Sequence, residues 1–295
     1  MYVDTDMMLI GPAGGLARPR ADIIEAGAGP LVVLVHASMA GVQQWKPLIA
    51  ELETQFLVRA VNLFGYGRTP AWNAGRDASL DDFAALVLQA VPPKGDVRLV
   101  GHSLGGAVAL HAATLLGPRV RDLILIEPSL FSLLDGTGDL AAFDEIRSLA
   151  RLTTGEHALL APEQAAAAFI DYWSGAGAWD ASSARTKAAV LNGLPRLQQE
   201  WAALLNGGGT RPGDWTASIR AQTLLLTFAE TVRPSRAIVQ LLSEAAPAWA
   251  VATLGEGGHM APVTHPHLVN PIIRGVLVRA QEPGFGGPVR PHTKI

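Results

Sequence analysis

The chain of 295 residues contains no cysteine. This absence excludes disulfide bonds, a cysteine nucleophile and metal sites built from thiolates. Charge is also scarce, because charged residues make up only 17% of the chain and the formal net charge is −3. Such a composition provides no basic field for nucleic acid and no polybasic patch for a membrane. We therefore expect a small molecule as the partner, and a monomer or a homodimer as the assembly.

Long apolar segments are absent as well. No stretch reaches the roughly 18 apolar residues of a membrane span, although the mean hydropathy is positive, at +0.24. The segment from Met1 to Gly15 lacks the positive start and the apolar run of a signal peptide. From these features we expect a soluble protein of the cytoplasm.

Short aliphatic segments alternate with amphipathic ones along most of the chain. The segment 31–36 is a continuous aliphatic run, which is typical of a strand buried on both faces. Further strands are expected at 21–26, 56–63, 96–100, 122–126, 222–228 and 249–254. Helices are expected at 42–54, 80–91, 104–116, 234–244 and 264–279. This order predicts an α/β fold with a doubly wound, mostly parallel sheet.

The alternation of strands and helices stops in the middle of the chain. From Ser129 to about Ser218 the sequence is rich in alanine, reads as helices without strands and carries four tryptophans, one of them Trp173. We expect residues 129–218 to form a helical cap, inserted between the two core segments 1–128 and 219–281. The last residues, 282–295, contain several glycines and prolines and are expected to form a flexible tail.

The segment around Ser103 carries the strongest motif. Gly101, Ser103 and Gly105 fit the pattern G-x-S-x-G between a predicted strand and a predicted helix. The glycines allow a turn tight enough to hold Ser103 in a strained, exposed position. The hydroxyl would then stand at a helix N-terminus, where the amide of Leu104 and the helix dipole favour negative charge. The alternative is a glycine-rich turn with an ordinary serine cap.

A serine nucleophile needs a base, and the base needs a third group that fixes its tautomer. His259 lies in a glycine-rich loop after the last predicted strand and is the candidate base. Two carboxylates compete to orient it, Glu127 at the tip of one strand and Glu230 after the next. A residue before proline is biased toward extended geometry. We therefore expect Glu127 to continue its strand and carry its carboxylate to the edge of the sheet, and we favour it over Glu230.

The chain resembles the α/β-hydrolase fold family over nearly its whole length. The resemblance is carried by residues 36–39, 64–69, 101–106 and 257–262. It implies the chain order serine, acid, histidine, which Ser103 and His259 follow with either carboxylate. It also implies that an amide shortly after His36 completes the oxyanion hole. By position this residue is Ser38, and Ala37 stands where the family usually has glycine.

The same resemblance bears on the acid and on the reaction. Most of the family has an aspartate where this chain has Glu230, whereas certain haloalkane dehalogenases and the zearalenone lactonases resemble it in having a glutamate at the position of Glu127. Haloalkane dehalogenases and epoxide hydrolases use aspartate where this chain has Ser103. A serine at that position favours acyl transfer to water.

We therefore expect a serine hydrolase that cleaves a carboxylic ester or lactone of an apolar small molecule through an acyl-enzyme, without a metal or cofactor. The residues expected to contact the substrate adjoin the predicted catalytic loops or lie in the predicted cap: Met39, His102, Phe131, Trp173 and Met260. Two alternatives stay open. One is a carbon–carbon bond hydrolase or a cofactor-free lyase or oxygenase on the same residues, and the other is a non-catalytic small-molecule receptor.

Overall fold

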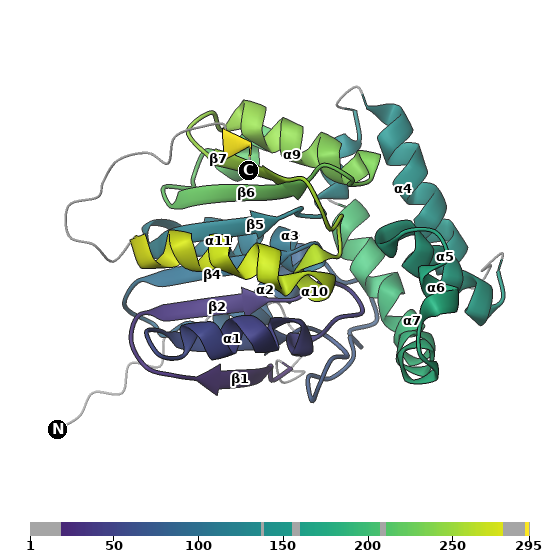
Figure 1. The fold of residues 1–295 in the computed structure, drawn as a ribbon, viewed down its shortest axis with the longest axis horizontal. Helices are drawn as coiled ribbons and strands as arrows, with labels where there is room; N and C mark the ends of the chain where they lie inside the picture. Colours follow the sequence, from purple (N-terminus) through teal and green to yellow (C-terminus); the bar gives the residue numbers. More distant parts are fainter. Residues whose placement is uncertain (1–18, 137–138, 155–159, 207–210, 280–292, 295) are drawn as a thin grey trace.

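A computed structural model describes residues 19–136, 139–154, 160–206, 211–279 and 293–294. The expectation about the first fifteen residues therefore lies outside the described residues, as does most of the expectation about the tail. In the described part the chain forms one central sheet, with strands in the order β1-β3-β2-β4-β5-β6-β7-β8 (Figure 1). The strands are β1 (Asp22–Ala26), β2 (Leu31–Val35), β3 (Leu57–Asn62), β4 (Val97–His102), β5 (Val120–Ile126), β6 (Gln222–Phe228), β7 (Ala250–Leu254) and β8 (Thr293–Lys294).

All neighbouring strands run parallel except β1, which pairs antiparallel with β3. Every residue of β2 and β4 is buried, as expected for strands covered by helices on both faces. The predicted α/β fold with a mostly parallel sheet is therefore confirmed. The short β8 extends the sheet beyond β7.

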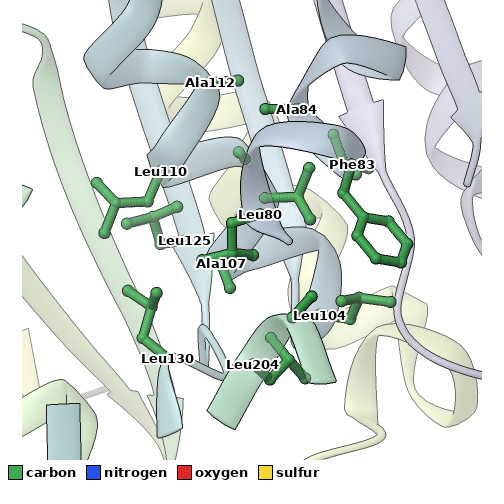
Figure 2. Packing of buried hydrophobic residues seen from close by; sticks show 14 of the residues in the cluster. Leu80, Phe83, Ala84, Leu104, Ala107, Leu110, Ala112, Leu125, Leu130 and Leu204 are labelled. Atoms are coloured by element: carbon green, nitrogen blue, oxygen red, sulfur yellow. The ribbon is translucent and has the colours of Figure 1, made fainter. Parts of the chain in front are cut away.

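Helices cover the two faces of the sheet with separate apolar clusters. On one face, α1 (Lys46–Leu52) and α11 (Pro266–Arg279) pack with side chains such as Trp45, Phe56 and Leu277. On the other face lie α2 (Leu80–Leu88), α3 (Leu104–Leu116) and α9 (Arg233–Ala245). Figure 2 shows the side chains of α2 and α3 interleaved in this second cluster.

Two predicted helices differ from the structure at their N-terminal ends. The segment 42–54 starts as the 3₁₀ turn η1 (Val42–Trp45) before α1 begins. The last helix, α11, begins two residues later than predicted, and the short α10 (Ala261–Thr264) precedes it, with His265 between them outside helical geometry. His265 precedes Pro266, and the proline ring disfavours helical geometry in the residue before it.

The regular elements between β5 and β6 are all helices in the described part of the chain. They are η3 (Phe131–Leu134), α4 (Leu140–Thr153), α5 (Pro162–Ser174), α6 (Ala178–Ala181), α7 (Ala184–Leu205) and α8 (Pro212–Thr216). Helices α4 to α7 lie beyond the carboxyl ends of the strands (Figure 1). Leu204 of α7 packs into the same cluster as Leu104 and Ala107 of α3 (Figure 2). These inserted helices therefore share an apolar core with the sheet.

None of the helices in the described ranges combines the length and the apolar character that crossing a membrane requires.

Candidate active site

Three strands are followed by residues with strained backbone geometry. In the described part of the chain, positive φ at a residue other than glycine occurs at Met39 (61°), Ser103 (56°) and Glu127 (42°). These residues follow β2, β4 and β5, which are neighbours in the sheet. Such strain costs on the order of 1–3 kcal/mol per residue and clusters at functional sites. The carboxyl ends of these strands are therefore the place to look for chemistry.

The turn around Ser103 depends on the absence of side chains beside it. A Cβ atom at Gly101 would collide with the carbonyl oxygen of Gly105, and one at Gly105 would collide with the carbonyl oxygen of Val35. Ser103 precedes the first residue of α3, and its own amide donates to the carbonyl oxygen of Ile126 at 2.9 Å. The expected tight strand-to-helix turn is present, and it fixes the Ser103 hydroxyl at the N-terminus of α3.

His259 reaches this hydroxyl from the loop between β7 and α10. Its Nε2 lies 3.0 Å from Ser103 Oγ, and its Nδ1 lies 2.7 Å from Glu127 Oε2. A carboxylate can only accept, so Nδ1 carries the proton and Nε2 accepts from Ser103. The loop can approach in this way because Gly257 and Gly258 both have positive φ, 98° and 58°.

The Glu127 carboxylate is fully buried, and four donors surround it. Oε1 accepts from the Thr227 hydroxyl (2.8 Å) and the Phe228 amide (3.1 Å), and Oε2 accepts from the Thr231 hydroxyl (2.7 Å) and His259. Burial would raise the pKa of Glu127, but the hydrogen bonds from His259, Thr231 and Thr227 outweigh burial, so the pKa is lowered. Glu127 is thus held in its ionised form.

Of the two candidate acids, only Glu127 contacts His259. Glu230 is exposed, and its side chain makes no hydrogen bond within the described part of the chain. The expected backbone of Glu127 was wrong, however, because its φ of 42° is left-handed rather than extended. The Glu127 amide still donates to the carbonyl oxygen of Leu226. The chain therefore turns at Glu127, and the carboxylate is directed across β6 toward His259.

The two predicted oxyanion donors have amides that are not used elsewhere. Among the described residues, the amides of Ser38 and Leu104 have no acceptor. The amides on either side of Ser38 are both bonded, Ala37 to Gln44 Oε1 at 3.1 Å and Met39 to Tyr66 Oη at 2.7 Å. The Leu104 side chain lies in the apolar core, so only its backbone could serve the site.

The prediction that His102 borders the substrate was wrong, because its ring lies fully buried beneath the site. His102 Nε2 donates to the carbonyl oxygen of His259 at 2.8 Å, and its Nδ1 accepts from Gln44 Nε2 at 3.1 Å. Burial and the neighbouring His259 hold the pKa of His102 well below its usual value. His102 therefore acts as a neutral support that ties the His259 loop to the loop after β2.

A mainly apolar cavity of about 490 Å³, part of it open to solvent, lies above Ser103 and His259. Four of the five expected substrate contacts line it: Met39, Phe131, Trp173 and Met260. The ring of Trp173, on α5, lies 4.3 Å from the His259 ring, centroid to centroid. The inserted helices thus bring aromatic side chains directly onto the predicted base.

Several side chains that shape the site had escaped the sequence analysis. Ser129 Oγ lies 3.1 Å from Ser103 Oγ and lines the cavity, as does Glu200 of α7. Thr227 and Thr231 hold Glu127. Strand register could have indicated Thr227, because Ile126 of β5 pairs with Leu226 of β6 and the next residues are Glu127 and Thr227. No local signal marks Glu200.

Comparison with known proteins identifies the family of the chain. The sequence profile of the alpha/beta hydrolase family matches residues 32–272. The chain belongs to this family, and esterases and other hydrolases among its relatives support a hydrolase enzyme.

The similar curated proteins match in one part only. The pimeloyl-[acyl-carrier protein] methyl ester esterase of Aliivibrio salmonicida is 34% identical over 103 residues, 35% of this chain and 38% of that protein. The 2-(acetamidomethylene)succinate hydrolase of Mesorhizobium japonicum is 30% identical over 114 residues, 38% of this chain and 40% of that protein. The chain thus matches about two fifths of the length of these relatives.

Solved structures match along most of the chain at lower identity. A hydrolase from Oleispira antarctica has a TM-score of 0.71 and 20% identity, covering 88% of this chain and 95% of that chain. Carboxylesterase CesB from Bacillus subtilis has a TM-score of 0.68 and 19% identity, covering 89% of each chain. At these identities the likeness establishes the fold.

Proposed function

We propose that the protein is a serine hydrolase that cleaves a carboxylic ester or lactone of an apolar small molecule. The observation that carries this proposal is the unbroken line of hydrogen bonds from Ser103 through His259 to Glu127. The apolar cavity above Ser103 supports an apolar substrate. The partial match to ester-cleaving relatives supports the same class of reaction.

In the proposed reaction, Ser103 Oγ attacks the carbonyl carbon while His259 Nε2 takes the hydroxyl proton. The amides of Ser38 and Leu104 stabilise the oxyanion, and ionised Glu127 stabilises the imidazolium. The leaving alkoxide departs with the proton from His259. Water then attacks the acyl-enzyme, with His259 as base again, which releases the acid and restores Ser103. From a lactone, the acid and the alcohol are released as one hydroxy acid.

The inserted helices α4 to α8 act in this proposal as a cap. They carry the aromatic side chains Trp173 and Trp201, which line the cavity. A cap of this kind keeps bulk water from the oxyanion while the apolar part of the substrate contacts the aromatic rings. The cap therefore limits which esters can reach Ser103.

The test is covalent labelling with a fluorophosphonate, combined with turnover of short p-nitrophenyl esters. We expect the label on Ser103 and steady ester turnover, which Ser103→Ala should reduce at least about 10⁴-fold in kcat. Ser218→Ala, which changes an exposed serine, is the matched control. Labelling without ester turnover would instead support another reaction on the same residues. A slow single turnover would support a small-molecule receptor.

A further inference from the structure

Glu200 is a buried carboxylate on the wall of the cavity. Among the described residues that line the cavity, it is the only acidic or basic side chain besides His259. It projects from the inserted helix α7 and is only 1% exposed. A buried carboxylate in apolar surroundings is costly unless hydrogen bonds compensate it. Its partners therefore indicate what it can bind.

The two oxygens of Glu200 differ in their partners. Oε1 accepts the Tyr66 hydroxyl at 2.7 Å, and Tyr66 Oη in turn accepts the Met39 amide at 2.7 Å. Tyr66 thus gives its only hydroxyl proton to Glu200. Oε2 is also buried and has no partner at good hydrogen-bond geometry in the described part of the chain, although the Ser38 hydroxyl lies close enough to the carboxylate to lower its pKa. Buried carboxylate oxygens normally accept at least one hydrogen bond, so Oε2 is the atom that can still take a donor.

A positive side chain on the same helix acts on the charge of Glu200 without forming an ion pair with it in the described part of the chain. Arg196 lies one helical turn earlier on α7, and its guanidinium lies 4.2 Å from the centroid of the Tyr66 ring. Burial raises the pKa of Glu200, and the hydroxyls of Ser38 and Tyr66 and the charge of Arg196 offset this rise only in part. Because Arg196 already places a positive charge near the carboxylate, Glu200 does not require a cationic ligand.

We propose that Glu200 Oε2 binds a neutral hydrogen-bond donor on the substrate, a hydroxyl or an N–H group. This inference rests on the proposed function, because it takes the cavity above Ser103 as the substrate site. The surrounding lining is apolar and includes Trp173, Trp201 and Leu204. The substrate class is thus an apolar ester or lactone that carries one polar donor besides the scissile ester group.

The experiment compares esters that differ only in one end group. One series consists of p-nitrophenyl alkanoates that end in hydroxyl, methoxy, methyl or ammonium, and a second series places the same groups on the alcohol half. In one of the two series, we expect wild-type kcat/KM to favour the hydroxyl ester over the methoxy ester by about tenfold or more, because methoxy accepts but cannot donate. The series that shows this preference identifies the half of the ester, acyl or alcohol, that faces α7.

Glu200→Gln should bring the ratio of kcat/KM for the hydroxyl ester to kcat/KM for the methoxy ester close to one. Its amide oxygen can still accept from Tyr66, while the amide nitrogen replaces the acceptor Oε2 with a donor. The ratio is the readout because Glu200 also holds Tyr66 and Met39, so the substitution can slow both esters equally. Glu163→Gln on α5 changes an exposed glutamate of the same inserted helices and should keep the wild-type ratio. If Glu200→Gln does not fold, Glu200→Asp should lower the ratio by withdrawing the carboxylate.

Three results would overturn the inference while leaving the proposed function intact. They are a wild-type ratio near one in both series, a preference for the ammonium ester, and a Glu200→Gln ratio equal to that of wild type. If Ser103 is labelled but no ester turns over, labelling rates of phosphonates with the same end groups supply the ratio. If Ser103 is neither labelled nor active, the proposed function fails and this inference fails with it.

Discussion

The site has two parts, a floor and a wall, which differ in how completely their buried polar atoms are hydrogen-bonded. The floor is the set of residues at the strand ends, with Ser103, Glu127 and His259 at its centre, and none of their side-chain polar atoms lacks a partner within the described chain. The wall is the cavity-lining part of α5 and α7, where aromatic rings surround Glu200 with its one unpaired oxygen. The floor can therefore define a reaction, and the wall can select a substrate.

The largest expected effect comes from a substitution in the floor that disturbs the hydrogen bonds of Glu127. Glu127 accepts four hydrogen bonds, and each of its two oxygens accepts one of them from an N–H group, the Phe228 amide at Oε1 and His259 Nδ1 at Oε2. Glu127→Gln must therefore place its NH₂ against one of these two N–H donors, which displaces His259 or reverses its tautomer. Steady-state kinetics on a p-nitrophenyl ester should show kcat reduced by about 10³–10⁴-fold.

Glu230→Gln is the matched control, because Glu230 is exposed beyond the end of β6. Its kcat should stay within about twofold of wild type, as for most surface substitutions. Loss of activity in Glu230→Gln with retention in Glu127→Gln would move the acid to the loop after β6. The floor as described here would then be wrong.

Much of the floor could be predicted from the sequence because local rules determine it. The helix 104–116 and the strand 222–228 have the predicted bounds, and the G-x-S-x-G motif correctly indicates the turn at Ser103. The contact between Glu127 and His259 follows from strand order and loop position. The backbone of Glu127 was mispredicted, because the bias before proline is weaker than the pull of four donors on its carboxylate.

The wall could not be predicted in the same way, because it is made by contacts between distant segments. Tyr66 and Glu200 are 134 residues apart in the chain. On a helix, a glutamate among alanines and leucines is indistinguishable from a solvated charge until the packing of that helix is known. His102 was misplaced for a related reason, because its bond to the His259 carbonyl spans 157 residues.

The second prediction concerns the stability of the floor against acid. His36 is fully buried, donates from Nδ1 to the Ala37 carbonyl oxygen and accepts the Leu63 amide at Nε2. Burial lowers the pKa of His36 from 6.5 to about 4. Above pH 6.5 both the folded and the unfolded chain are neutral at this residue. As the pH falls, the unfolded chain binds a proton first, so His36 lowers the free energy of unfolding by about 2 kcal/mol at about pH 5.

Urea unfolding at about pH 7 and about pH 5 measures this loss. His36→Gln keeps an acceptor for Leu63 without titrating, so its loss between the two pH values should be smaller by about 2 kcal/mol. His267→Gln, at an exposed position of α11, should keep the wild-type loss. An equal loss in all three proteins would assign the acid sensitivity to other groups, such as the similarly buried His102.

The smallest expected effect comes from Trp173, and it tests whether the wall also takes part in the reaction. The Trp173 ring lies 4.3 Å from the His259 ring, at 35° to its plane. During the proposed reaction His259 becomes a cation, and an aromatic face stabilises a cation by about 0.5–2 kcal/mol. Trp173→Leu should therefore lower kcat/KM about tenfold even for p-nitrophenyl acetate, whose acyl group is too short to gain much from the wall.

Trp179 provides the comparison, because it packs in a separate small cluster with Ala166 and Val190. Trp179→Leu should lower the melting temperature without changing kcat/KM for the acetate ester. If both variants lose kcat/KM equally, Trp173 contributes only to the packing of the inserted helices, and the floor performs the reaction alone. If Trp173→Leu alone is slow with the acetate ester, the wall stabilises the charge on His259 as well as selecting the substrate. In that case Glu200 acts only in the selection of the substrate, whereas Trp173 also takes part in the reaction.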